Sequence, residues 1–378
     1  MRDDAARRGL ALHTQTYGGI VRDLDGDGRD DLVIGTHAAP LRIFLARGAG
    51  FVPLPGPDFP RVDRHGCAAA DVDGSGLPDL FCTVGAERGL GVKRNELWID
   101  PGRLGATQDG ADAAGLVDPF GRGRAAVFLD VDADRDPDLA VFSDPTRQDG
   151  LPSRSRLFRN DGGRFTEMPP GSLDPRSGGG CAIAADVDGD GRRDLVTCAG
   201  IGAAEDAFLR VHRNAGGRLV PMPVPAVVRD VSVVGAAVAD LGGGPEPEIA
   251  IVDGSRVRVL GRLARGGWRI LLEHPVPGAE AVAAGDADGD GRRDLYVVAG
   301  RSRRDVADLL LLNRGAGIPW EPVPIPPAPA GRGEAVLVID PESDGRDAFL
   351  VLNGQGIPGP VQLITIEPAL PGSVEAIR

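Results

Sequence analysis

Residues 186–195 read Asp-Val-Asp-Gly-Asp-Gly-Arg-Arg-Asp-Leu, and this pattern recurs along the chain. Close copies begin at Asp23, Asp71, Asp130 and Asp286, and two degenerate copies begin at Asp240 and Asp340. The seven starting positions are 48, 59, 56, 54, 46 and 54 residues apart. Copies that recur at a period of about fifty residues indicate a repeat architecture.

The repeated segment has the chemistry of a calcium loop. Carboxylates at its positions 1, 3, 5 and 9 direct oxygen ligands toward one point, and glycines at positions 4 and 6 allow the sharp turn that this requires. Calcium accepts about six to eight oxygens in flexible geometry, whereas magnesium demands a near-ideal octahedron. The loops contain no His or Cys, which argues against zinc. We expect about four to five structural Ca²⁺ ions, held by Asp23, Asp25, Asp27, Asp31, Asp71, Asp73, Ser75, Asp79, Asp130, Asp132, Asp134, Asp138, Asp186, Asp188, Asp190, Asp194, Asp286, Asp288, Asp290 and Asp294.

The copies are not equal. The second loop has the neutral Ser75 at position 5, and the third replaces both glycines, with Ala133 and Arg135. The loop at Asp240 keeps only that residue and Glu248, so we expect it to bind nothing and Glu248→Ala to have little effect. In the loop at Asp340 the last acid arrives one residue early, which leaves its site open. An Asp/Gly-rich turn without metal is the alternative for any single loop.

The flanking sequences predict strands rather than the helices of an EF-hand. Position 12, where an EF-hand requires a bidentate Glu, is Ile34, Thr197 or Val297. Short apolar runs bounded by turn residues precede and follow each loop, as in GGIV before Asp23 and LVIG after Asp31. Each unit therefore begins with a strand–loop–strand hairpin.

Seven such units predict an all-β fold, a single seven-bladed β-propeller over residues 1–378. Third and fourth strands are expected over 157–160 and 164–168, and the Ala- and Gly-rich first strand suits the crowded axis. A β-solenoid is the rival, but its rungs are shorter, at about 20–30 residues. Either residues 1–4 or residues 374–378 could close the ring.

Composition excludes several classes of protein. The net charge is −13, but the five better loops hold 19 of the 55 acidic residues, which assigns much of the acidity to metal sites. No basic cluster interleaved with aromatics is present, so we expect no nucleic-acid partner, and no apolar stretch is long enough for a membrane span. We expect a monomer. The start MRDDAARRGL lacks an apolar signal region, so the protein is cytoplasmic, or it is extracellular or periplasmic after removal of an export signal.

The four cysteines occupy equivalent positions around two of the loops. Each of these two repeats has one cysteine before its loop and one after it: Cys67 and Cys82 in the second repeat, and Cys181 and Cys198 in the fourth. Their distances from the loop place each pair opposite one another in the same antiparallel register, with the two pairs on adjacent rungs. Two cross-strand disulfides or two pairs of buried free thiols are both compatible with this spacing.

The loops resemble the FG-GAP/VCBS repeats of integrin α-subunit propellers. The segment LFRNDGGRFTEM at 157–168, with the preceding AAGL junction at 113–116, is similar to the cartilage acidic protein/UnbV group in particular. This resemblance implies a calcium-binding propeller and covers nearly the whole chain. It does not imply one activity, since such propellers include adhesion modules and lectin-like binders. Since few residues follow the seventh repeat, we expect the C-terminal domain that often follows the propeller in that group to be missing.

A functional site is expected on the face opposite the calcium loops. The residue six positions before each first Asp should surround the mouth of the axial channel there: Tyr17, His65, Arg124, Gly180, Val234, Glu280 and Glu334. His37, Lys93 and Asp144 lie in loops on the same face. We expect a ligand-binding module for a protein, glycan or small molecule. The alternatives are an enzyme that modifies a small metabolite with His65, Glu280 and Glu334, and solvated edge residues without a role.

Overall fold

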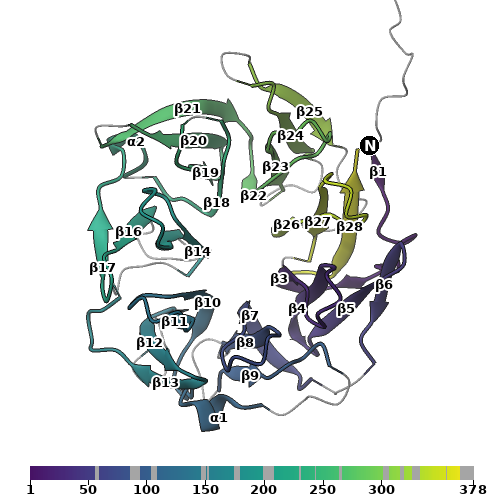
Figure 1. Ribbon diagram of the computed structural model, residues 1–378. Helices are drawn as coiled ribbons and strands as arrows, with labels where there is room; N and C mark the ends of the chain where they lie inside the picture. The colour runs from purple at the N-terminus through teal and green to yellow at the C-terminus, as the bar shows by residue number, and fades with distance from the viewer. Residues whose placement is uncertain are drawn as a thin grey trace, which may run out of the picture.

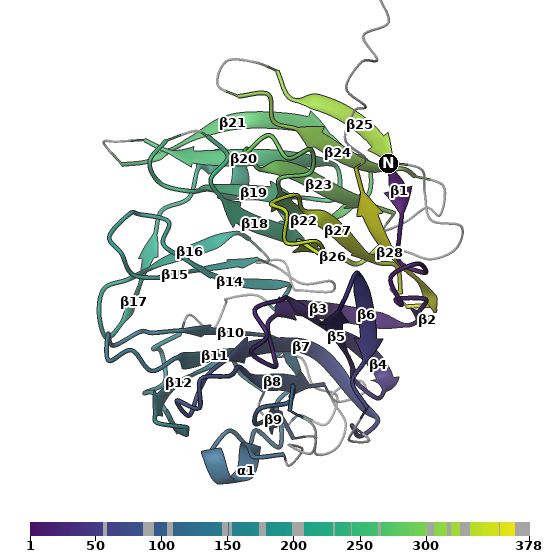
Figure 2. The ribbon, with the colours of Figure 1, turned by 45° about the vertical axis from the view of Figure 1, so that its right-hand side comes forward.

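The computed structural model describes residues 1–55, 59–85, 94–103, 109–145, 150, 153–173, 179–198, 208–229, 231–242, 244–263, 266–300, 306–315, 319–325, 333–354 and 356–366. These residues form antiparallel sheets arranged in a ring about a central axis (Figures 1 and 2). The fold is a β-propeller. No helix in the described part of the chain is long and apolar enough to cross a membrane.

Four of the sheets have four strands each, in sequence order from the axis outward. They comprise β10 (Gly123–Leu129), β11 (Asp138–Ser143), β12 (Arg156–Asp161) and β13 (Arg164–Glu167); β14 (Cys181–Ala185), β15 (Asp194–Cys198), β16 (Arg210–Asn214) and β17 (Leu219–Met222); β18 (Gly235–Ala239), β19 (Glu248–Val252), β20 (Arg256–Arg262) and β21 (Trp268–Pro275); and β22 (Ala279–Gly285), β23 (Asp294–Ala299), β24 (Asp308–Leu312) and β25 (Glu321–Ile325). The strands expected over 157–160 and 164–168 are confirmed as β12 and β13.

A fifth sheet joins the two ends of the described chain. It contains β26 (Ala335–Ile339), β27 (Ala348–Leu352) and β28 (Gly359–Thr365), with β1 (Arg2–Asp3) and β2 (His13–Thr14) paired on β28. The N-terminal segment therefore supplies the outermost strand (Figure 1). Residues 374–378, the other candidate for ring closure, lie outside the described residues.

The first two repeats share one seven-stranded sheet, so the prediction of seven separate blades is wrong. This sheet contains β3 (Thr16–Arg22), β4 (Asp31–Ala39), β5 (Arg42–Arg47), β6 (Gly50–Pro53), β7 (Val62–Ala70), β8 (Asp79–Val84) and β9 (Glu96–Trp98). Strand β4 has 9 residues where its counterpart β15 has 5. Its extra length reaches the next repeat, where it pairs with β7 through His37↔Asp63 and Ala39↔Val62. The other five sheets remain separate.

The repeats pack through small residues at the axis and large apolar residues outside it. A Cβ on Gly66 of β7 would lie 2.6 Å from the Cα of Ala125 in β10, so only glycine allows these inner strands to approach so closely. Farther out, one cluster joins buried Phe81 to Phe128 and to Leu116, which follows the short helix α1 (Ala111–Ala114). A second short helix, α2, spans Ala226–Arg229.

Both cysteine pairs are disulfides. Cys67 faces Cys82 across β7 and β8, and Cys181 faces Cys198 across β14 and β15. Their Cα–Cα distances are 4.1 and 5.0 Å, in line with one non-hydrogen-bonded and one hydrogen-bonded rung. The structure thus selects disulfides over free thiols.

Candidate functional site

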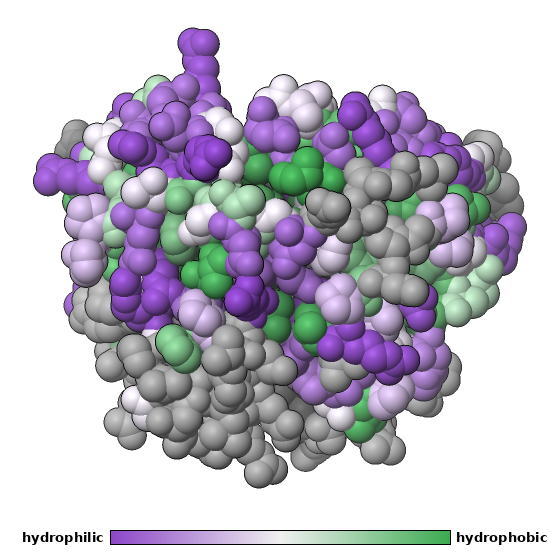
Figure 3. All heavy atoms as spheres, turned by 90° about the horizontal axis from the view of Figure 1, so that it is seen from below, coloured by the Kyte–Doolittle hydropathy of each residue, from purple (hydrophilic) through white to green (hydrophobic). Residues whose placement is uncertain are grey.

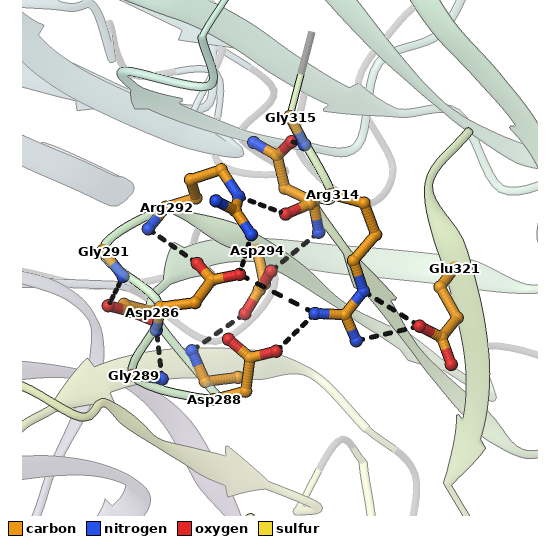
Figure 4. Close-up of polar contacts among 12 residues, drawn as sticks. Asp286, Asp288, Gly289, Gly291, Arg292, Asp294, Arg314, Gly315 and Glu321 are labelled. Atoms are coloured by element: carbon orange, nitrogen blue, oxygen red, sulfur yellow. Dashed lines mark hydrogen bonds and ion pairs between the residues drawn. The ribbon is translucent and has the colours of Figure 1, made fainter. Parts of the chain in front are cut away.

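The repeated loops share one backbone turn around their first aspartate. In the sixth repeat, Asp286 Oδ1 accepts the backbone N–H groups of Gly289 (2.8 Å) and Asp290 (3.1 Å), and its Oδ2 accepts that of Gly291 (2.8 Å; Figure 4). Both glycines have positive φ. In the third repeat Ala133 and Arg135 hold the same conformation, with φ of 67° and 81°, although neither is glycine. Replacement of the glycines has therefore left the turn intact.

The loop carboxylates also converge. Ligand-capable oxygens lie within 4.8 Å of one another in groups that include Asp23, Asp25 and Asp27; Asp71, Asp73 and Asp79; Asp130, Asp132 and Asp138; and Asp186, Asp188 and Asp194. A set made only of carboxylate oxygens fits a hard cation such as Ca²⁺ better than a softer transition metal. The residues present thus fit the ion that the loop chemistry implies.

The acid at position 9 has a structural role that the sequence did not reveal. Asp194 is fully buried; its Oδ2 accepts the N–H of Val187 (3.0 Å), and its Oδ1 accepts that of Asn214 on the third strand (2.8 Å). The equivalent pairs of bonds are made by Asp31, Asp79, Asp138 and Asp294. This side chain therefore ties the start of the loop to the third strand whether or not a cation is bound.

The two degenerate loops keep parts of this arrangement. Glu248 is only 1% exposed, and its Oε2 accepts the N–H of Leu241 (2.8 Å). From the structure, in contrast to the sequence, we expect Glu248→Ala to be destabilising. Asp347, the early acid of the last repeat, instead accepts the N–H of Asp286 (2.8 Å) in the neighbouring repeat. Because this acid is shifted by one residue, it bonds to the neighbouring repeat, whereas the position-9 acids of the other repeats bond within their own repeat.

Three buried asparagines, which sequence reasoning missed, also join neighbouring repeats. The Nδ2 groups of Asn160, Asn214 and Asn313 donate to the backbone oxygens of Val72 (2.9 Å), Asp130 (2.7 Å) and Leu241 (3.1 Å). Each asparagine follows the position-9 acid of its own repeat by 19 to 22 residues. This recurring spacing was the sequence signal that could have identified these asparagines.

At the opposite end of the axis, β-bulges carry four of the predicted mouth residues. The irregular segments contain Tyr17, His65, Arg124 and Glu280. The register of the inner strand shifts between Thr16 and Gly19, between Arg64 and Gly66, between Gly123 and Ala125, and between Ala279 and Ala281. A bulge leaves one residue unpaired and re-aims its side chain, and bulges are common beside functional sites. The six-residue offset in the sequence thus marks a real structural position.

Two histidines, a tyrosine and an aspartate come together at this mouth. The Tyr17 ring centroid lies 5.0 Å from that of His37 and 4.8 Å from that of His65. The Nε2 atoms of His37 and His65 lie 2.9 and 3.0 Å from the same oxygen, Asp63 Oδ1. Sequence reasoning missed Asp63, although it lies only two residues before His65.

Charged residues surround this cluster. Asp144 Oδ2 lies 2.7 Å from Arg122 Nη1 and 3.6 Å from Arg124 Nη2. Burial lowers the pKa of His65, and the nearby guanidinium of Arg124 lowers it further, whereas Asp63 opposes the shift. Burial would raise the pKa of Asp63, but His65, His37 and Arg124 together hold it below its usual value. Lys93 lies outside the described residues.

Glu334 borders the same mouth. Thr16 Oγ1 donates to Glu334 Oε2 over 3.4 Å. Burial raises the pKa of Glu334 to about 8, and the nearby carboxylate of Glu280 contributes to the increase. Glu280 is 4% exposed. The structure therefore connects the predicted residues through neighbouring interactions: Tyr17 interacts with Arg124 and Glu334, His65 interacts with Arg124 and His37, and Glu280 lies beside Glu334.

The axial cavity lies deeper than the mouth. It has a volume of about 890 Å³, and inner-strand residues such as Gly19, Ala68 and Ala126 line it together with Asp71 and Asp130 of the repeated loops. Among the described residues of its lining, none is Tyr17, His65 or Arg124. The polar cluster at the mouth is therefore separate from the lining of this cavity.

Comparison with known proteins agrees with the fold and the repeats. The FG-GAP-like repeat matches residues 23–82 and 130–197. The chain is similar to a structure titled "Crystal structure of BBS1N in complex with ARL6DN, soaked with mercury" (TM-score 0.53, 14% identity, 97% of each chain covered). It is also similar to "YCF48 bound to D1 peptide" (TM-score 0.54, 10% identity, 94% of this chain and 96% of that chain covered). No curated protein matches the sequence. The chain thus carries FG-GAP-like repeats within a β-propeller, a fold that suggests an interaction module.

Proposed function

We propose that this propeller is a calcium-stabilised ligand-binding module that uses the mouth around Tyr17, His65 and Arg124. The observation that carries the proposal is the set of bulges: inner strands of four repeats depart from regular pairing where each presents a polar side chain. Such departures cost pairing interactions, and they cluster where function requires them.

The proposed division of labour separates the two ends of the axis. The loops would bind Ca²⁺ and stabilise each hairpin, because the ion would be shared by their convergent carboxylates, some of which already pair with arginines such as Arg47 and Arg314. The opposite mouth combines aromatic rings with charges of both signs, which suits a polar ligand such as a glycan, a metabolite or a protein segment. The titles of the two similar structures each name a bound partner, ARL6DN or the D1 peptide, which supports a role in binding.

The surface in Figure 3 also favours the mouth as the binding site. On the side drawn there, the described residues are mostly hydrophilic, and hydrophobic residues form small, separate patches. Large continuous apolar patches are typical of stable protein interfaces. The mouth is therefore a better candidate than this side of the ring.

The test is a thermal-shift screen of monosaccharides, oligosaccharides and polar metabolites in millimolar calcium. A ligand that raises the melting temperature of the wild type should fail to do so with the double variant His65→Ala/Glu280→Ala, whose own calcium-dependent melting should be retained. A double variant that binds the ligand normally would move the site away from the mouth.

An enzyme that modifies a small metabolite is the second candidate. Burial shifts the pKa of His65 down and that of Glu334 up to about 8, and perturbed acids and bases of this kind are common in active sites. The two functions separate on one measurement. Incubation of a screened ligand with the protein should return it unchanged from a binding module and chemically altered from an enzyme.

A further inference from the structure

We propose that His37, Asp63 and His65 form a binding site for a divalent transition metal of the zinc class, distinct from the repeated loops. The site lies in the proposed ligand-binding mouth, but metal binding can be measured directly and does not depend on that function.

The distances between the ligand atoms are close to those of a tetrahedral zinc site. His37 Nε2 and His65 Nε2 lie 2.9 and 3.0 Å from Asp63 Oδ1, and the three ligand atoms are all within 4.8 Å of one another. With bond lengths of about 2.0–2.2 Å, neighbouring ligands of tetrahedral Zn²⁺ are roughly 3.3 Å apart. The two nitrogen–oxygen distances therefore lie within a few tenths of an ångström of those in such a site.

The contact atom of Asp63 lacks a suitable donor. Asp63 Oδ1 is buried and has no well-aligned hydrogen-bond donor, although His65 Nε2 lies close enough to interact with it. An oxygen of this kind is costly when it is unsatisfied. A cation held jointly by the oxygen and the two nitrogens would remove that cost.

The backbone holds the three side chains in place. His37 and Asp63 are Cα partners across β4 and β7, and the bulge at His65 turns that ring toward the same point. A Cβ on Gly85 would lie 2.7 Å from His65 Cδ2 and 3.1 Å from Asp63 Oδ2, so glycine provides the necessary space. Ligands borne by paired strands are positioned more accurately than ligands on free loops.

The ligand chemistry separates this site from the loops. Two imidazoles and one carboxylate suit zinc and related transition metals, whereas Ca²⁺ prefers oxygen ligands alone. The side chains of His37, Asp63 and His65 are 33%, 20% and 14% exposed, so an ion can enter and keep a coordination position for water or a ligand. Arg124 opposes a cation here, but its ion pair with Asp144 offsets part of that charge.

The experiment titrates the metal-stripped full chain with Zn²⁺ in excess calcium, by calorimetry and by competition with a chromogenic indicator. The variants are His37→Ala, His65→Ala and Asp63→Asn, with His274→Ala on β21 as the matched control. Thermal melts in calcium verify that each variant is folded. Co²⁺ provides a second readout, because its visible absorption reports nitrogen and oxygen ligation.

We expect the wild type and His274→Ala to bind one strong equivalent of Zn²⁺. Loss of a residue that only supports a metal ligand weakens metal binding by about 10–100-fold. Loss of either His37 or His65, which would bind the ion directly, should weaken zinc binding by at least this factor and should remove the Co²⁺ absorption. Absence of strong zinc binding by the wild type would overturn the proposal, as would equal losses in His65→Ala and His274→Ala. If zinc binds but the ligand screen finds no ligand, the metal site stands and only the ligand-binding proposal is overturned.

Discussion

His37 and Asp63 are paired both through their backbones and through their side chains. Their backbones form the pairing through which β4 and β7 join the first two repeats into one sheet, and their side chains approach to 2.9 Å at the channel mouth. The departure from separate sheets therefore occurs where the polar cluster forms. The extended pairing fixes the imidazole on one repeat against the carboxylate on the next.

Removal of calcium should lower the melting temperature markedly. An ion that binds only the folded state stabilises it by about 2.7 kcal/mol per site when its free concentration is about a hundred times Kd. Thermal melts in calcium and in a calcium-selective chelator measure the difference, and magnesium serves as the control that should not restore the loss. Identical melting curves in calcium and chelator would rule out structural calcium.

Asp188→Ala and Glu248→Ala should differ in their dependence on calcium. Asp188 belongs to a convergent carboxylate group, so its loss should matter mainly when calcium is present. Loss of Glu248 leaves the buried N–H of Leu241 without its acceptor, which costs about 1–3 kcal/mol in calcium and in chelator alike. Urea unfolding under both conditions tests this, with Glu246→Ala as a control in the same loop. A loss at Glu248 that disappears in chelator would contradict its structural role.

Arg64→Ala should be among the most destabilising single changes. The Arg64 side chain is completely buried, and its Nε and Nη2 lie 2.5 and 2.9 Å from the two carboxylate oxygens of Glu96. Removal of one partner of a buried ion pair costs about 3–5 kcal/mol, because the other charge is left buried. Urea unfolding measures the loss.

The exposed pair Arg94 and Asp112 provides the control for this buried pair. Their side chains are 61% and 63% exposed, so Arg94→Ala should cost about 1 kcal/mol or less. The double variant Arg64→Leu/Glu96→Leu should recover much of the stability lost in Arg64→Ala, since no unpaired charge remains. Equal costs for the buried and the exposed pairs would refute the argument.

Stability should also respond to pH through Glu334. Its pKa is raised from 4.5 to about 8 by burial, so the folded state holds the proton more tightly than the unfolded state does. The stabilising contribution is complete below pH 4.5 and is lost as the pH rises through about 8. Relative to Glu334→Gln, the wild type should therefore lose stability over this range. Unfolding in saturating calcium measures the loss, and the exposed Glu321→Gln should keep the wild-type profile.

Local chemistry made the turns of the loops and the bulged positions of the inner strands predictable. The turn around each first aspartate depends on residues a few positions apart, and the mouth residues keep a fixed offset from it, so a single sequence contains both signals. The cysteine register follows from the same offsets, and the structure then decides in favour of disulfides.

Contacts between repeats were not predictable in the same way. Asp63 acquires its role only because β4 extends into the next repeat, and nothing in the sequence near His37 encodes that pairing. The structural role of the position-9 acids was hidden for another reason: a carboxylate suits a metal and a backbone N–H equally well. The burial of Asp194 and the two N–H groups that it accepts reveal this second role, beside the predicted role in metal binding.

The pairing of β1 with β28 has a consequence for folding kinetics. Arg2 pairs with Thr365, and the N–H of Asp4 donates to the backbone oxygen of Leu363 over 2.8 Å. The segment around Arg2 is therefore synthesised long before its partner strand and has to wait for it. Contacts between such distant residues slow folding, whereas each internal hairpin can form as soon as it is synthesised. We expect the ring to assemble repeat by repeat and to gain its full cooperativity only in the last step, when its two ends meet.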